Sequence, residues 1–196
     1  MIIKPFEKFH QSNITSRFNA NEPWRGAIHT GTDFVSPEGY GTPLLAPTDC
    51  SITKIITPGR ILNEAEGLEH LKRGYGVEME GGDGTFYLYW HCLPIFPVRE
   101  GEIAKRGKIV AFMGNSGLVY RFGKLVPLEV RSIFPYLGAH LHAEKYRWEN
   151  GQKKYYDFAL DIDWNIPISL KPIDKIFAFR VAISKITALF KDYVRN

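Results

Sequence analysis

The sequence predicts a mainly β protein built on an antiparallel sheet, with an amphipathic α-helix near its C-terminal end. Four short apolar runs, bounded by Gly, Pro, Asn and Asp, predict strands at residues 51–57, 77–80, 86–91 and 108–113. After Pro172 the apolar residues recur at helical spacing instead, which predicts the helix. These residues are Ile176, Phe179, Ile183, Ile186 and Phe190.

The chain of 196 residues, of which 44% are hydrophobic, has enough apolar material for one packed domain. We expect this domain at residues 1–165 and a helical extension at 166–196 that packs on it. The polar face of the predicted helix is mainly basic, so contact with an anionic membrane or a partner is the alternative to packing. Its charged residues are Lys175, Arg180, Lys185, Lys191 and Arg195 against Asp174 and Asp192.

The net charge of +4 and the pI near 9.0 favour approach to anionic polymers. Nucleic acid is not an expected partner, because the basic residues are spread along the chain rather than clustered with stacking aromatics.

The first residues show no secretion signal, and no apolar run is long enough to span a membrane. Two cysteines, Cys50 and Cys92, are too few for a disulfide framework, and we expect both to be reduced and packed.

Two histidine motifs, more than a hundred residues apart, predict a metal site. The first is His29-Thr30-Gly31-Thr32-Asp33 and the second is His140-Leu141-His142. Zinc binds histidine nitrogen and carboxylate oxygen, and a catalytic zinc site takes three such ligands and leaves one position open for water. His29, Asp33 and one histidine of the later pair would make that set. Each motif alone also fits a structural histidine or a turn-capping aspartate.

A third element lies between these motifs. The turn signal Gly81-Gly82-Asp83-Gly84 precedes the run Phe86-Tyr-Leu-Tyr-Trp-His91, which predicts the return strand of a hairpin. Strand alternation predicts that Tyr87, Tyr89 and His91 share one face. His91 is then a candidate catalytic histidine, and an aromatic core strand is the alternative.

Taken together, these motifs resemble the lysostaphin/LytM-type zinc endopeptidases, which cut peptide bonds in bacterial peptidoglycan. The resemblance runs from about Ile14 to Tyr146 and includes Gly114-Asn-Ser-Gly117. It implies a β-sheet metallopeptidase fold with His29, Asp33 and His142 as zinc ligands. It also implies that His140 and His91 are the catalytic pair that handles protons.

The sequence departs from the family pattern in two insertions and in one loop. The insertion at about 118–138 is expected to form a wall of the substrate groove. The insertion at about 58–73 carries His70, which fits a solvated helix better than a metal site. The loop before His29 lacks the tyrosine that some members use to stabilise the oxyanion, so Arg25 and Tyr89 are the candidate oxyanion or substrate contacts.

Other functions fit the sequence less well. A D-Ala-D-Ala carboxypeptidase would need a longer interval between His29 and Asp33, and a Cys–His hydrolase at Cys92 and His91 would leave the other motifs unexplained. A carrier domain would need a lysine at Gly114–Gly117. A catalytically silent wall-binding or structural module on the same fold remains the alternative.

Without a signal, we expect a phage lysin or virion-associated enzyme, or else a secretion-delivered toxin, that acts on the wall in the periplasm or outside the cell.

Overall fold

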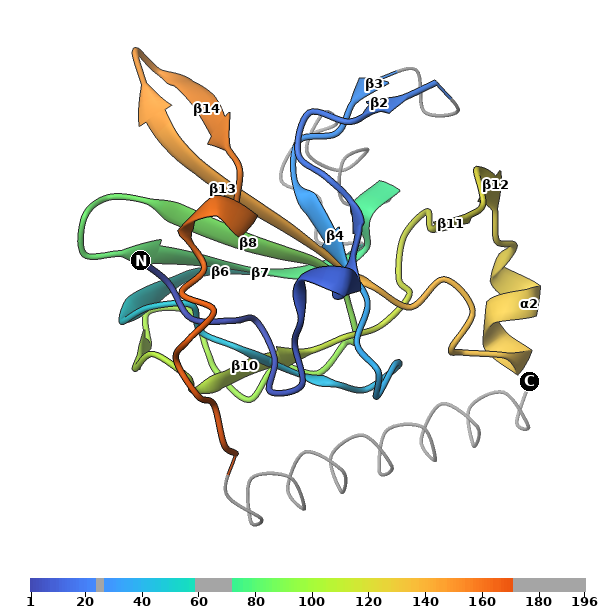
Figure 1. The fold of residues 1–196 in the computed structure, drawn as a ribbon, viewed down its shortest axis with the longest axis horizontal. Coiled ribbons are helices and arrows are strands. Elements are labelled where there is room, and N and C mark those ends of the chain that lie inside the picture. The colour runs from blue at the N-terminus through green and yellow to red at the C-terminus, as the bar shows by residue number, and fades with distance from the viewer. Residues whose placement is uncertain (24–26, 59–71, 171–196) are drawn as a thin grey trace.

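A computed structural model describes residues 1–23, 27–58 and 72–170 (Figure 1). The predicted C-terminal helix, Arg25 and His70 lie outside these ranges. In the part of the chain that the structure describes, short helical segments join the strands, among them the 3-10 helices η1 (Gln11–Asn13) and η2 (Ala159–Asp161) and the α-helix α2 (Leu128–Ile133). Within the described ranges, no helix has the length and apolar character needed to cross a membrane.

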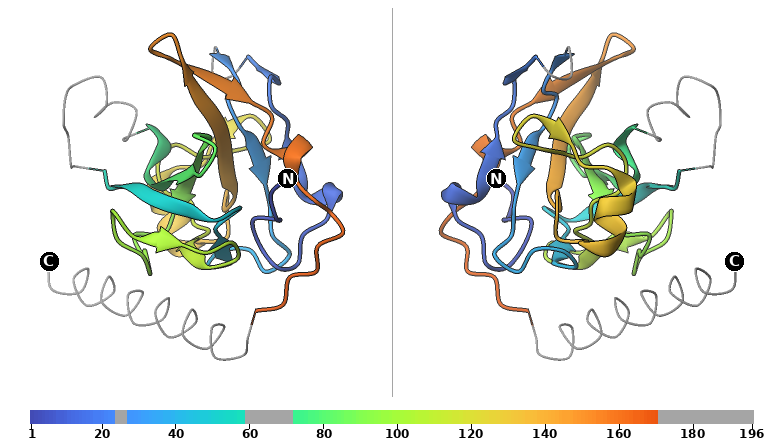
Figure 2. Two further views of the ribbon diagram at one scale, coloured as in Figure 1. Left: turned by 90° about the vertical axis from the view of Figure 1, so that its left-hand side faces the viewer. Right: turned by 90° about the vertical axis from the view of Figure 1, so that its right-hand side faces the viewer.

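The main sheet has eight strands, and all of its pairings are antiparallel. The path across it is β1 (Ile14–Ser16), β4 (Thr32–Phe34), β13 (Leu141–Glu149), β8 (Phe86–Cys92), β7 (Tyr75–Gly81), β6 (Cys50–Ile56) and β9 (Ile103–Ala104). The eighth strand, β14 (Gln152–Tyr156), pairs with the far half of β13. Figure 2 shows how the β13–β14 hairpin projects from the sheet.

Three two-stranded sheets complete the described structure. The first joins β5 (Pro43–Leu45) to β10 (Ile109–Phe112), and the second joins β2 (Asn21–Glu22) to β3 (Ala27–Ile28). The third, β11 (Tyr120–Arg121) and β12 (Lys124–Leu125), belongs to the insertion at 118–138. The four strands predicted from apolar runs correspond to β6, β7, β8 and β10, so the mainly antiparallel β architecture is confirmed.

The two faces of the main sheet carry different side chains. Phe34, Tyr89, Leu141 and Ala143 belong to one buried apolar cluster, and the Tyr89 hydroxyl donates a hydrogen bond to the Leu45 carbonyl at 3.0 Å. A second cluster includes Ile56, Leu88, Trp90 and Tyr146. Because side chains alternate along β13, His142 and Glu144 share the face of Tyr146 rather than that of the main core.

The strand β8 departs from regular alternation at its end. Between the pairs Tyr75–Cys92 and Val77–Tyr89, β8 has one residue more than β7, which is a β-bulge. His91 lies in this bulge with a φ of +59°. The expectation that Tyr87, Tyr89 and His91 share one face is therefore wrong: both tyrosines pack in the main core, whereas His91 lines the groove described below.

Candidate metal centre

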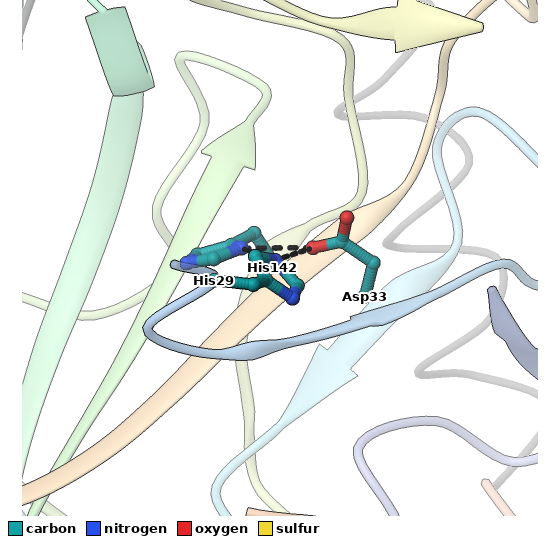
Figure 3. Close-up of side chains that lie close together, drawn as sticks. All are labelled: His29, Asp33 and His142. Carbon is teal, nitrogen blue, oxygen red and sulfur yellow. Dashed lines mark hydrogen bonds and ion pairs between the residues drawn. The ribbon is translucent and has the colours of Figure 1, made fainter. Parts of the chain in front are cut away.

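His29, Asp33 and His142 come together on the face of the sheet opposite the main core (Figure 3). Asp33 on β4 lies directly across from His142 on β13, and His29 follows β3. His29 Nε2 lies 3.1 Å from Asp33 Oδ1 and 2.9 Å from His142 Nδ1, and the last two atoms are 2.8 Å apart. All three residues are buried. Three ligand atoms of the types that zinc prefers thus meet at one point.

The glycine of the first motif makes this approach sterically feasible. A Cβ atom on Gly31 would lie 2.6 Å from the carbonyl oxygen of Ala143 and 2.8 Å from His142 Nε2. Both distances are far below van der Waals contact, so a larger residue would push the loop away from β13. The pattern His-x-Gly-x-Asp therefore combines two candidate ligands with the small residue that lets them reach the third.

Hydrogen bonds outside the cluster leave the inner ligand atoms suited to a cation. His29 Nδ1 lies 2.9 Å from the Arg17 carbonyl, so its proton is on that nitrogen and the Nε2 lone pair faces the cluster. His142 Nε2 lies 2.9 Å from Arg73 Nη1 and 3.3 Å from Glu144 Oε1, so a guanidinium that only donates and a carboxylate both contact the outer nitrogen of this ring. His29 Nε2 and Asp33 Oδ1 thus offer lone pairs to the cluster, and His142 Nδ1 would offer a third to a bound cation.

The charge state of the centre supports the same assignment. Burial favours the neutral acid of Asp33, but the charge of His140 and the hydrogen bonds that the protonated forms of His142 and His29 make to it hold its pKa well below the ordinary value. Burial also opposes the charged form of His29, and here the hydrogen bond to Asp33 and its negative charge leave the pKa above the ordinary value. Asp33 is therefore an ionised carboxylate at neutral pH, the form that binds a metal.

Two further histidines flank the three ligand residues. His91 Nδ1 lies 2.7 Å from the Ser116 carbonyl, and His140 Nδ1 lies 2.8 Å from the Gly138 carbonyl. In each ring the backbone hydrogen bond is therefore made by Nδ1 and not by the other nitrogen, Nε2. The two ring centroids are 4.5 Å apart, and His140 Nε2 lies 3.8 Å from Asp33 Oδ2. Burial and the charges of His140 and His142 hold the pKa of His91 well below its ordinary value. His91 is thus a neutral imidazole at neutral pH.

A buried charged network supports His142 from outside. Glu144 Oε1 accepts hydrogen bonds from Arg73 and Thr30, each at 2.5 Å, and Glu144 Oε2 accepts one from the Trp90 indole at 3.2 Å. Burial would favour its neutral acid, but the hydrogen bond with His142 and the charge of Arg73 hold the pKa of Glu144 well below the ordinary value. The sequence motifs do not indicate Arg73, Thr30 or Trp90 as members of this network.

Asn115 and Ser116, in the loop at 114–117, lie beside His91 rather than beside a candidate ligand. The Asn115 side chain donates to the Pro135 carbonyl at 2.8 Å, and the Ser116 hydroxyl donates to the Cys92 carbonyl at 2.8 Å. These bonds hold the loop whose Ser116 carbonyl orients His91. Gly114 is required there as well, because a Cβ atom would lie 2.8 Å from the backbone of Cys92.

Two adjoining cavities open beside the centre. One, of about 300 Å³, is lined by His29, His91 and His142, and the other, of about 620 Å³, is lined by Asp33 and His140. Tyr120 from the insertion lines both cavities, and β11 with the turn that follows it, at Phe122 and Gly123, forms a wall of the larger one. The insertion thus borders the groove, as the sequence predicted. Tyr89 is fully buried in the core, so the expectation that it contacts substrate is wrong.

The sequence matches no family model and no curated protein. Solved structures do resemble the fold. The catalytic domain of the prophage-encoded M23 protein EnpA from Enterococcus faecalis superposes with a TM-score of 0.50 and 22% identity, over 76% of this chain and 93% of that one. A zinc-containing peptidase from Vibrio cholerae gives a TM-score of 0.50 and 21% identity over 78% of this chain.

The same fold occurs in another setting. The SpoIIQ–SpoIIIAH pore-forming complex gives a TM-score of 0.51 and 17% identity, over 79% of this chain and 87% of the matched chain. This chain spans only 39% of the Vibrio peptidase and 55% of a LytM protein from Ruminococcus gnavus. At these identities the likeness establishes the fold. The described part of this protein has the mainly antiparallel lysostaphin/LytM-type fold that the sequence motifs predicted.

Proposed function

We propose that this protein is a zinc-dependent endopeptidase that hydrolyses peptide bonds in bacterial peptidoglycan, in stem peptides or their cross-links. One observation carries the proposal: His29 Nε2, Asp33 Oδ1 and His142 Nδ1 converge within about 3 Å of one another beside a groove. The resemblance to peptidases of the same fold supports it. Two nitrogens and one oxygen leave a tetrahedral zinc one open position.

In this proposal His29, Asp33 and His142 hold the zinc ion. A zinc ion bound there would polarise the scissile carbonyl and lower the pKa of water toward neutrality. The Arg17 carbonyl keeps the outer nitrogen of His29 protonated, and Glu144 and Arg73 both contact the outer nitrogen of His142, so both rings keep the orientation that binding needs.

His91 and His140 move protons in the proposed reaction. Each donates its Nδ1 proton to a backbone carbonyl, so each Nε2 is able to accept a proton from the attacking water and return it to the leaving amine. Because the pKa of His91 is low, His91 is neutral at the start of the cycle and ready to act as the base. The bulge in β8 directs this side chain into the groove.

The source of the enzyme forms part of the proposal. The resemblance to the prophage-encoded EnpA supports a phage lysin or virion-associated enzyme. A secretion-delivered toxin would use the same active site. A catalytically silent module is the second candidate, because a pore-forming complex contains the same fold. The complete ligand set and its flanking histidines favour the enzyme over that module.

The test measures metal content and wall hydrolysis together. Purified protein is incubated with Gram-negative and Gram-positive sacculi, with chelator and after zinc is restored, and released fragments are identified by mass spectrometry. We expect one zinc per chain and zinc-dependent peptide cleavage that His142→Ala abolishes. His10→Ala is the matched control, because His10 is exposed and lies outside the centre. Bound zinc without release from any wall would overturn the endopeptidase and favour the silent module.

A further inference from the structure

The insertion at 118–138 is the part of the described structure with the most exposed apolar side chains. Eight of the thirteen large hydrophobic side chains recorded as exposed lie between residues 118 and 136. Exposed apolar surface of this density commonly marks an interaction site. The eight are Leu118, Phe122, Leu125, Leu128, Val130, Ile133, Phe134 and Tyr136.

The base of the insertion is firmly attached to the protein. Val119 and Val126 are buried and hydrogen-bonded to each other through their backbones at 3.0 Å. Arg131, the one buried residue of α2, donates a hydrogen bond to the Asn115 carbonyl. The exposed side chains therefore belong to an anchored structure. A helix of six residues has little stability of its own and usually depends on packing of its apolar side chains. The apolar side chains of α2 are nevertheless outside the core.

The hairpin β11–β12 ends in a turn that carries an exposed aromatic ring. Phe122 and Gly123 both have positive φ, at +50° and +73°, which is the geometry of a tight hairpin turn. This geometry is unfavourable for phenylalanine, yet it leaves the side chain 92% exposed. Figure 1 shows the hairpin and α2 at the edge of the molecule, away from the eight-stranded sheet.

Two cations flank this aromatic tip. Arg121 and Lys124 lie directly opposite each other in the β11–β12 pair, and both are exposed. Like charges at opposed positions destabilise a strand pair. The Arg121 guanidinium also lies 5.2 Å from the centre of the Phe122 ring. An anionic surface placed against the tip would neutralise both charges while it accepted the apolar side chains.

We propose that the insertion docks the protein onto an anionic lipid bilayer, with Phe122 and the apolar residues of α2 entering the interface. The apolar side chains project from a turn and from a helix on which only Arg131 is buried. A protein partner would need a hollow that matches this projection. A fluid lipid interface accommodates such a projection, and Arg121 and Lys124 lie where lipid phosphates would meet them. Because Phe122 and Tyr136 line the larger cavity, docking would hold the groove close to the membrane surface.

The first test is co-sedimentation of the full chain with vesicles of phosphatidylcholine alone or mixed equally with phosphatidylglycerol. We expect binding to the anionic vesicles only. Lys124→Gln should weaken this binding about fivefold. The triple variant Leu125→Ser, Leu128→Ser, Ile133→Ser should weaken it at least about tenfold. The matched control combines Ile103→Ser and Leu160→Ser, which are 65% and 83% exposed elsewhere and should have no effect.

A probe at the tip gives a second measurement. Cys50 and Cys92 are buried, so an environment-sensitive dye on Phe122→Cys reports on the tip alone. We expect its emission to brighten and shift to the blue with anionic vesicles, while the same dye on Leu160→Cys does not change. Undiminished binding by the triple variant would overturn the proposal and assign binding to another segment, such as the predicted basic helix at the C-terminal end. Self-association that the triple variant abolishes, without vesicle binding, would overturn it in favour of a second copy of this chain.

Discussion

Glu144 Oε1 lies 3.3 Å from His142 Nε2, on the side of the imidazole ring opposite the candidate metal position. Both residues come from one face of β13, two positions apart, so a regular strand is enough to bring them together. Carboxylates in this position orient a metal-binding histidine and set its tautomer.

Glu144→Gln should therefore lower zinc affinity by about 10- to 100-fold, because an amide lacks the negative charge that pairs with Arg73 and so holds the His142 ring less firmly than a carboxylate. Competition with a fluorescent zinc chelator measures the change. Glu149→Gln on the same strand serves as the control, since Glu149 is exposed and distant from His142 along β13. Equal zinc affinity in the two variants would contradict the role of Glu144.

His91→Ala should reduce wall hydrolysis by about 10²- to 10⁴-fold while the protein keeps its zinc. The physical reason is that His91 lies beside the ligand residues without belonging to them. His142→Ala should lose both zinc and hydrolysis, so metal analysis separates the two variants. If His91→Ala loses zinc as completely as His142→Ala, His91 is a ligand and the proposed division of roles is wrong.

The pKa of His91 also predicts a pH dependence of stability for the metal-free protein. The folded pKa is well below 6.5, so between that value and about 6.5 the unfolded chain binds more protons than the folded one. Stability from this group is complete above about pH 6.5 and declines as the pH falls toward the folded pKa. Urea unfolding at a series of pH values should show a shallower decline for His91→Asn than for the unchanged protein. Parallel curves would show that His91 titrates normally.

Gly76→Ala should destabilise the fold by about 1–3 kcal/mol, because the new methyl group has no room. A Cβ atom at this position would lie 2.7 Å from the Tyr89 carbonyl oxygen and 2.9 Å from the Trp90 ring. The matched control is Gly82→Ala, where nothing lies within 4 Å of the added atom. Urea denaturation of both variants checks the prediction, and an equal midpoint for the two would refute the steric argument.

The local pattern of the sequence predicts much of the architecture. Apolar runs between turn residues correspond to β6, β7, β8 and β10, since period-two alternation and turn chemistry act over a few residues. The motif residues His29, Asp33 and His142 also meet in the structure, although residue spacing alone does not place segments a hundred residues apart. That expectation depended on the order of motifs in a resembling family, whose fold this chain shares.

Other features depend on tertiary contacts that no local pattern encodes. Regular alternation assigns His91 to the face of Tyr89, but one extra residue in β8 opposite Gly76 reverses its direction. Arg73 reaches Glu144 only because β13 and the segment before β7 lie together, and nothing near Arg73 in the chain indicates a buried carboxylate partner. The sequence by itself determined the four strands with apolar runs, because these follow from short-range pattern, and it named the candidate ligand residues through motifs that resemble those of a known family. Only the tertiary structure decided toward which face of the main sheet the His91 side chain points and that Glu144 and Arg73 lie together beside His142. The reason is that bulges and buried ion pairs arise from contacts between distant segments.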